Sequence, residues 1–179
     1  QAISTGDVRI IKSLSELGSI LSLGEIDQIY NAQTHLLNEE AYFNVIKAKT
    51  ASLFMSCVAM GGYAVKASDE DIALLRQFAE LLGMCFQIRD DIFDYFEDEK
   101  IGKPTGNDLR EGKITLPLLS VLLREDLPGH KKMLELSRKE QLSTEEIATL
   151  IEYAKANGGI DYAYETMARL RTQAIAIMD

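Results

Sequence analysis

The sequence predicts an all-α protein. Apolar residues recur at intervals of three and four along most of the 179 residues, which is the spacing of one face of a helix. Alternating runs of β-branched residues are scarce, and only three prolines interrupt the helical pattern. A length of 179 residues is enough for one domain with a substantial core, and a hydrophobic fraction of 46% argues against disorder.

The composition also excludes several classes of function. A net charge of −9 disfavours nucleic acid or an anionic membrane as the main partner. No apolar run is long enough to span a bilayer, and no signal peptide is visible. Cys57 and Cys85 lack CxxC spacing, so we expect reduced core cysteines in a cytoplasmic protein. His35 and His130 have no partner that would suggest catalysis, and both are interpreted as structural or exposed.

The first helical pattern, from about Gly6 to Asn31, predicts either one bent helix or two short ones. Within it, Glu25 and Gln28 share a face, as solvated surface or as the lining of a polar cavity. A second helix should begin after Asn38, a good N-cap, and run to about Met60. We expect it to stop at the glycine pair 61–62.

Lys49 and Thr50 lie within one turn of the apolar stripe of that second helix. Lys49 either extends its charge into solvent or faces a pocket, with the Thr50 hydroxyl beside it. The stripe itself consists of Phe43, Ile46, Leu53, Phe54, Cys57 and Met60.

The third helix should open with a capping box of Ser68 and Asp71. Its apolar positions are Ile72, Leu75, Phe78, Ala79, Leu82, Cys85, Phe86 and Phe93. A separate stripe, made of Gly83, Gln87, Asp90 and Asp94, turns one face of a largely buried helix polar over two turns. Buried polar groups need partners, so this stripe predicts a functional site.

Six acidic residues crowd into the ten positions from Asp90 to Glu99. On a helix, Asp90 and Asp94 are one turn apart with Asp91 beside them, and such like charges repel by roughly 0.2–0.5 kcal/mol per pair. They also oppose the helix dipole near its C-terminus. A hard divalent cation would relieve the repulsion, and a ligand set of oxygen atoms suits Mg²⁺.

A Gly/Pro-rich segment with four cations, residues 100–113, follows the acids. Its glycines allow a phosphate to approach the backbone, and its lysines supply point charges. Carboxylates would hold Mg²⁺ against phosphate oxygens while the lysines neutralise the remaining charge. No nucleophilic serine, cysteine or histidine is evident, so these groups suit the electrostatic ionisation of a carbon–oxygen bond.

The rest of the chain predicts four more helices. One begins at Ile114–Pro117 and reaches about Arg124, and a short one spans 131–136. A capping box at Ser143–Glu146 opens a helix to about Ala156. The last helix runs from Ile160 to Met178, with Ile160, Ala163, Met167, Leu170, Ala174 and Ile177 facing inward.

Several of these segments resemble one family. The stretch FQIRDDIFD at Phe86–Asp94 resembles the second aspartate-rich motif of the all-trans polyprenyl diphosphate synthases. Residues 102–117 are similar to the loop that follows it, in wording closest to bacterial medium- and long-chain synthases such as octaprenyl diphosphate synthases. Further matches, which extend the resemblance over nearly the whole chain, are Lys49-Thr50, Gly24-Glu25 with Gln28, and Gly159 with Asp161-Tyr162-Ala163.

The resemblance implies an isoprenoid synthase-type helical bundle and a Mg²⁺-dependent prenyl transfer. An allylic diphosphate ionises, the double bond of isopentenyl diphosphate attacks the cation, and loss of a proton to the released pyrophosphate completes a polyprenyl diphosphate. The resemblance implies that the metal is held by Asp90, most directly, with Asp91 and Asp94. It further implies diphosphate contacts from Lys49 and Lys103, a cavity lined by Thr50 and Gln87, and charge from Lys113 at its mouth.

One departure from the family is large. Its members carry a first aspartate-rich motif upstream, whereas the only DDxxD here is Asp90–Asp94. We therefore expect residues 1–179 to be the C-terminal part of a single synthase domain, an incomplete bundle that exposes apolar surface and is inactive alone. The resemblance implies a homodimer.

Two alternatives stay open: a class I terpene cyclase, and a non-catalytic diphosphate-binding subunit of a heteromeric prenyl synthase. The loop at 102–109 and the Lys49-Thr50 pair disfavour the cyclase.

Overall fold

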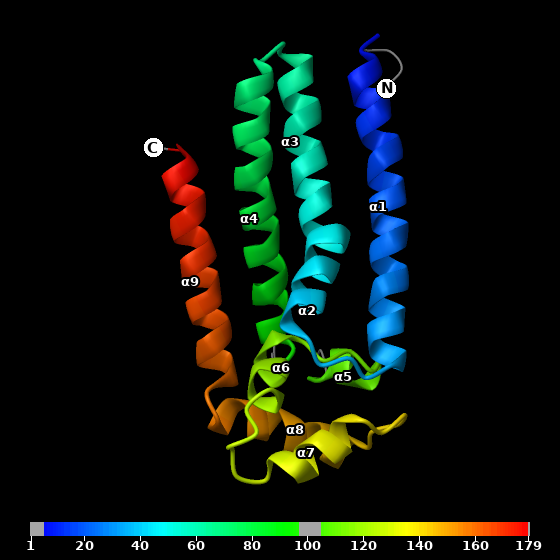
Figure 1. Cartoon of the computed structure of the whole chain (residues 1–179), viewed down its shortest axis with the longest axis vertical. Coiled ribbons are helices and arrows are strands. Elements are labelled where there is room, and N and C mark those ends of the chain that lie inside the picture. Colours follow the sequence, from blue (N-terminus) through cyan, green and yellow to red (C-terminus); the bar gives the residue numbers. More distant parts are fainter. Residues whose placement is uncertain (1–5, 97–104, 179) are drawn as a thin grey trace. The chain divides into compact units, whose positions relative to one another are not determined.

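The computed structural model describes residues 6–96 and 105–178. Every regular element in these ranges is helical, which confirms the all-α prediction (Figure 1). The elements are α1 (Val8–Gln33), α2 (Glu39–Ile46), the π-helical turn η2 (Lys47–Ala51), α3 (Ser52–Ala64), α4 (Asp69–Phe93), α5 (Asn107–Arg110), α6 (Leu116–Leu122), α7 (His130–Ser137), α8 (Thr144–Ala156) and α9 (Gly159–Met178).

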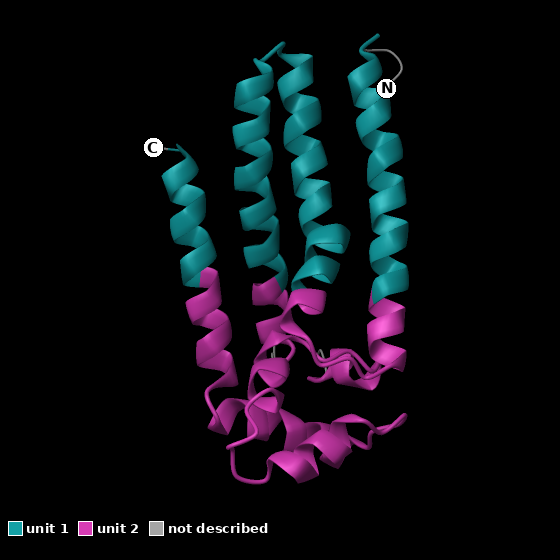
Figure 2. Ribbon diagram, viewed as in Figure 1, with its two compact units in different colours: residues 1–27, 43–87, 168–179 teal, residues 28–42, 88–167 magenta. Residues whose placement is uncertain are grey.

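The chain divides into two compact units (Figure 2). Unit 1 consists of residues 1–27, 43–87 and 168–179, and unit 2 of residues 28–42 and 88–167. The division falls inside helices α1, α2, α4 and α9. That residues 1–179 belong to a single domain stays a prediction.

In unit 1, α1 packs on η2, and η2 and α3 pack on α4, through positions that have little or no side chain. A Cβ added to Gly83 of α4 would lie 2.5 Å from the Cα of Ala51, and one added to Gly24 of α1 would lie 2.7 Å from the Cβ of Ala48. Both distances are shorter than a carbon–carbon contact permits, so these helices approach closely only because the residues are glycines.

Unit 2 is built around a cluster of large apolar side chains. Helices α6, α7 and α8 pack against one another, and Tyr95 from the turn after α4 joins them. The buried members of the cluster are Tyr95, Leu109, Leu118, Val121, Leu122, Met133, Ile147, Leu150, Ile151 and Ala154. A hydrogen bond from the Leu118 N–H to the Tyr95 hydroxyl, at 3.2 Å, ties the end of α4 to the start of α6.

The predicted N-caps are confirmed. The Asn38 side chain accepts the Ala41 N–H at 2.8 Å, and Ser68 accepts the Asp71 N–H at 3.0 Å. Ser143 forms a complete capping box at α8, with a hydrogen bond in each direction between it and Glu146. These local hydrogen bonds explain why the helix starts were well predicted from sequence.

Several boundaries differ from the prediction. Of the two alternatives left open for the first helical pattern, the structure has the single helix, at residues 8–33. Helix α3 continues through the glycine pair to Ala64, since neither Gly61 nor Gly62 has the positive φ of a glycine C-cap. The expected α-helix from Asn38 to Met60 is interrupted by η2, where the backbone widens for one turn.

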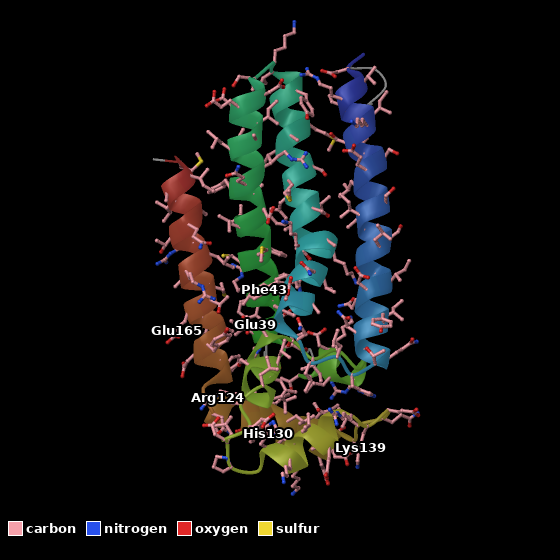
Figure 3. All side chains as sticks on the ribbon, viewed as in Figure 1. Glu39, Phe43, Arg124, His130, Lys139 and Glu165 are labelled. Atoms are coloured by element: carbon pink, nitrogen blue, oxygen red, sulfur yellow. The ribbon has the colours of Figure 1, made fainter. Side chains whose placement is uncertain are left out.

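The two cysteines are free, as predicted, but Cys57 is exposed, so its placement in the core was wrong. His130 is buried and structural, donating from Nε2 to the Leu122 carbonyl oxygen at 2.9 Å (Figure 3). No helix in the described ranges combines the length and hydropathy that a membrane crossing requires.

Candidate active site

The three aspartates of the acidic motif occupy three different environments, although the sequence predicts one shared helical face. Asp90 and Asp91 lie in the last turn of α4, which ends at Phe93. Asp90 is exposed, Asp91 is only 4% exposed, and Asp94 is half-buried in the turn beyond the helix. The prediction that Asp94 continues the helix was therefore wrong.

Asp94 leaves the helix because its carboxylate binds the N-terminus of α5. Its two oxygens accept the N–H groups of Asn107 and Asp108, each at 3.0 Å. Its carbonyl oxygen accepts the Gly106 N–H at 2.9 Å. A carboxylate at this position offsets the positive end of the short helix. Asp94 therefore holds the backbone at the start of α5 in place.

Asp91 points into unit 2 and accepts a hydrogen bond of 2.6 Å from the Tyr42 hydroxyl of α2. Burial raises the pKa of Tyr42 well above its usual value, and the negative charge of Asp91 raises it further. The hydroxyl therefore keeps its proton and remains a donor.

Asp108 is a carboxylate that the sequence argument did not single out. Burial raises the pKa of Asp108 above its usual value; the charge of Asp94 adds to this shift and that of Lys113 opposes it. In the sequence, Asp108 could have been noticed as the acid that closely follows Gly106 in the Gly/Pro-rich segment. In the structure, its backbone N–H donates to Asp94 of the acidic motif. Crowding of carboxylates in unit 2 is the electrostatic condition that a divalent cation relieves.

Lys113 also belongs to this group. Its ammonium forms an ion pair with Glu111 and lies 4.0 Å from a carboxylate oxygen of Asp108. Lys113 therefore places a positive charge beside Asp108 and Glu111, and its role at the mouth of a diphosphate site stays a prediction. Lys103 lies outside the described residues.

In unit 1, Lys49 and Thr50 both lie on the π-helical turn η2. Short π-helical segments within α-helices frequently occur at functional sites. Thr50 donates a 2.6 Å hydrogen bond to the side-chain oxygen of Gln87 on α4, so the structure brings these two predicted site residues together. Lys49 forms an ion pair with Glu25 of α1.

The donor set of the acidic motif fits a hard cation. No group of three His, Cys, Asp or Glu side chains within residues 6–96 and 105–178 is gathered closely enough to hold a metal by itself. Asp90 nevertheless presents an exposed carboxylate, and a carboxylate oxygen that accepts one hydrogen bond retains a second lone pair. The aspartates of the motif offer only oxygen ligands, which suit Mg²⁺ better than a softer metal.

The all-α fold matches the isoprenoid synthase helical fold, and the comparison with known families agrees. The Polyprenyl synthetase family pattern matches residues 1–154, and the chain belongs to this family.

Among its relatives is the octaprenyl diphosphate synthase of Escherichia coli, 30% identical over 98% of this chain and 54% of that protein. The geranylgeranyl pyrophosphate synthase of Bacteroides thetaiotaomicron has a similar structure, with a TM-score of 0.91, 40% identity, and coverage of 98% of this chain and 58% of that one. A Corynebacterium glutamicum synthase complexed with isoprenyl diphosphate and magnesium has a TM-score of 0.86 and 26% identity, covering 96% of this chain and 49% of that one. The chain spans about half the length of the curated relatives it matches.

Proposed function

We propose that the complete gene product catalyses Mg²⁺-dependent prenyl transfer, condensing isopentenyl diphosphate with an allylic diphosphate to form a polyprenyl diphosphate. The observation that carries this proposal is the geometry at the end of α4. There Asp90 presents an exposed carboxylate, and Asp94 of the same motif binds the backbone of Asn107 and Asp108 in the Gly/Pro-rich segment. Within this proposal, residues 1–179 are the C-terminal part of a single synthase domain.

The roles of the side chains follow from their chemistry. Asp90 would hold Mg²⁺ on the allylic diphosphate, while the buried Asp91 and the half-buried Asp94 add negative charge in the same motif. Lys49 and Lys103 contact that diphosphate, and Lys113 adds charge at the mouth of the site. The hydrogen bond between Thr50 and Gln87 supports their place in the cavity lining, because it holds two polar side chains in a fixed orientation on packed helices.

Mg²⁺, when bound, neutralises the diphosphate and makes it a better leaving group. The allylic carbon–oxygen bond breaks and its electron pair leaves with the pyrophosphate. The double bond of isopentenyl diphosphate then attacks the allylic cation, and the pyrophosphate takes the proton that is lost. The lysines stabilise the negative charge that develops on the leaving oxygen.

Lys49 must change partners in this scheme. Its ammonium is paired with Glu25, whose side chain is 53% exposed, while that of Lys49 is 29% exposed. Exposed ion pairs contribute about 1 kcal/mol or less, so a diphosphate with several negative oxygens can displace Glu25.

The test is an elongation assay with the complete gene product, labelled isopentenyl diphosphate, an allylic diphosphate and Mg²⁺. We expect chain extension, and we expect Asp90→Ala to lower turnover by about a hundredfold or more, as loss of a group that stabilises the transition state does. Asp126→Ala, an acid that takes no part in this scheme, is the matched control. Extension by wild type that Asp90→Ala leaves unchanged would refute the role of Asp90, and no extension by wild type would refute the function.

We further propose that the protein is a cytoplasmic homodimer. Leu23 and Ile26 of α1 are 61% and 60% exposed, and a second subunit would cover them. Free thiols at Cys57 and Cys85 support a reducing compartment. Sedimentation velocity of the complete gene product tests the dimer, and a monomer at micromolar concentration would contradict it.

A further inference from the structure

Two neighbouring aspartates at the end of α4 differ sharply in exposure. Asp90 is exposed, whereas Asp91 is 4% exposed. Consecutive residues of a helix point about 100° apart, so one helical turn carries one carboxylate outward and the other into unit 2.

The inward carboxylate has a buried partner. The Tyr42 hydroxyl donates to Asp91 Oδ2 at 2.6 Å, across 49 residues of sequence, and Tyr42 is itself only 9% exposed. A buried carboxylate is costly unless hydrogen bonds stabilise it, and a bond of this length between a hydroxyl and an anion is among the stronger kinds.

Tyr42 belongs to α2, whose first turn is held by further hydrogen bonds of Asn38 and Glu39. Asn38 caps the start of α2. One turn before Tyr42, Glu39, which is labelled in Figure 3, accepts the hydroxyl of Tyr162 of α9 on both carboxylate oxygens, at 2.8 and 2.9 Å. All these residues belong to unit 2. The Tyr42 hydroxyl is therefore a fixed point against which the last turn of α4 is held.

We propose that Tyr42 and Asp91 are positioning residues, which hold the last turn of α4 so that Asp90 presents its carboxylate to the metal-bound diphosphate. Asp91 thereby acts as an internal anchor and not as a metal ligand. This inference rests on the proposed function, because it assigns separate roles within the same acidic motif.

Thermal unfolding of the metal-free protein tests the anchor by itself. Tyr42→Phe and Asp91→Ala should each lower the unfolding midpoint, because each removes the buried hydrogen bond between the Tyr42 hydroxyl and the Asp91 carboxylate. Asp90→Ala should not lower the midpoint, since its side chain is exposed and its charge opposes the helix dipole and repels the neighbouring acids. An Asp91→Ala midpoint equal to that of wild type would overturn the proposal.

Binding of Mn²⁺ with inorganic pyrophosphate, followed by electron paramagnetic resonance, tests the division of roles. Asp91→Asn keeps an oxygen acceptor for Tyr42, so its affinity should stay within about threefold of wild type, whereas Asp91→Ala and Tyr42→Phe should weaken binding about tenfold, as loss of an outer-shell partner does. Asp90→Asn should weaken it about a hundredfold, because it removes the ligand itself.

Two results of the binding experiment have different meanings. If Asp91→Asn loses as much affinity as Asp90→Asn, then Asp91 is a ligand and the positioning role is wrong. If wild type binds no Mn²⁺ with pyrophosphate, the proposed metal role of the motif fails, and the unfolding midpoints still decide whether Tyr42 and Asp91 form an anchor.

Discussion

The two units are stabilised in different ways. The largest fully buried side chains in the described part of the chain all belong to unit 2: Ile88, Ile92, Leu116, Leu118, Leu119, Leu150, Val121, Thr166 and Pro117. In unit 1 the most completely buried hydrophobic residues are alanines, Ala51, Ala59 and Ala79. Unit 1 also exposes large apolar side chains, including Leu23, Leu53, Leu74, Leu82 and Phe86.

This difference shows which part of the chain supports the acidic motif. Burial of large apolar side chains is the main source of folding free energy, so unit 2 carries most of its own stabilisation. Asp90, Asp91 and Asp94 all belong to unit 2, and Ile88 and Ile92 of the same helix turns are fully buried. The motif is therefore held from the core of unit 2, whereas unit 1 relies more on close backbone approach at small residues.

The largest effect should come from the core of unit 2. Leu118→Ala removes a side chain that is 0% exposed, and we expect a loss of about 2–5 kcal/mol in the free energy of unfolding. Leu74→Ala in unit 1, where the side chain is 43% exposed, should change it by about 0.5 kcal/mol or less. Urea denaturation measures the free energy of unfolding of both variants. Equal losses would show that the two units do not differ in how large apolar side chains stabilise them.

An intermediate effect should come from the glycine contact of unit 1. Gly83→Ala places a methyl group 2.5 Å from Ala51 Cα, and overpacking of this kind costs about 1–3 kcal/mol. Gly61→Ala is the matched control, because nothing lies within 4 Å of its added Cβ and alanine favours helix by about 1 kcal/mol. The denaturation midpoint should therefore fall for Gly83→Ala and rise for Gly61→Ala. A rise for Gly83→Ala would show that η2 and α4 are not in close contact at this position.

The smallest effect concerns the cap of α8. A hydrogen bond from Lys139 lowers the pKa of Glu146 below its usual 4.5, and the Ser143 N–H lowers it further. A depressed folded pKa stabilises the fold above pH 4.5, and this contribution disappears as the pH falls through the folded pKa. Glu146→Gln should therefore lower the unfolding midpoint slightly at pH 7 and not at pH values near 2.

The control for this prediction is Glu145→Gln, which removes an acid from the same first turn but leaves the capping box intact. Equal pH dependence in the two variants would mean that general charge near the helix N-terminus, rather than the capping box, is responsible.

Local signals explain what the sequence could predict. The caps at Asn38, Ser68 and Ser143 depend on residues three positions apart, and periodicity placed every long helix. The end of α4 was misjudged because Asp94 binds N–H groups 13 and 14 residues away, a contact that periodicity cannot report.

Tyr42 was missed for a similar reason. A tyrosine at an apolar helical position gives no sign in the sequence that its hydroxyl meets Asp91, 49 residues further along. The interruption at η2 likewise has no single-residue signal, although it carries Lys49 and Thr50. Sequence reasoning thus proposed the residue types of the candidate site, and the structure showed how Asp90, Asp91 and Asp94 differ in burial and in hydrogen-bond partners.

Hydrogen exchange of the complete gene product, with and without Mg²⁺ and inorganic pyrophosphate, tests the central claim most directly. We expect slower exchange in the segments 86–96 and 105–113, because a ligand held there opposes local opening. Asp90→Asn should abolish that protection. Protection that persists in Asp90→Asn, or that appears only in segments of unit 1 away from Lys49, would contradict the assignment of this acidic motif as the diphosphate site.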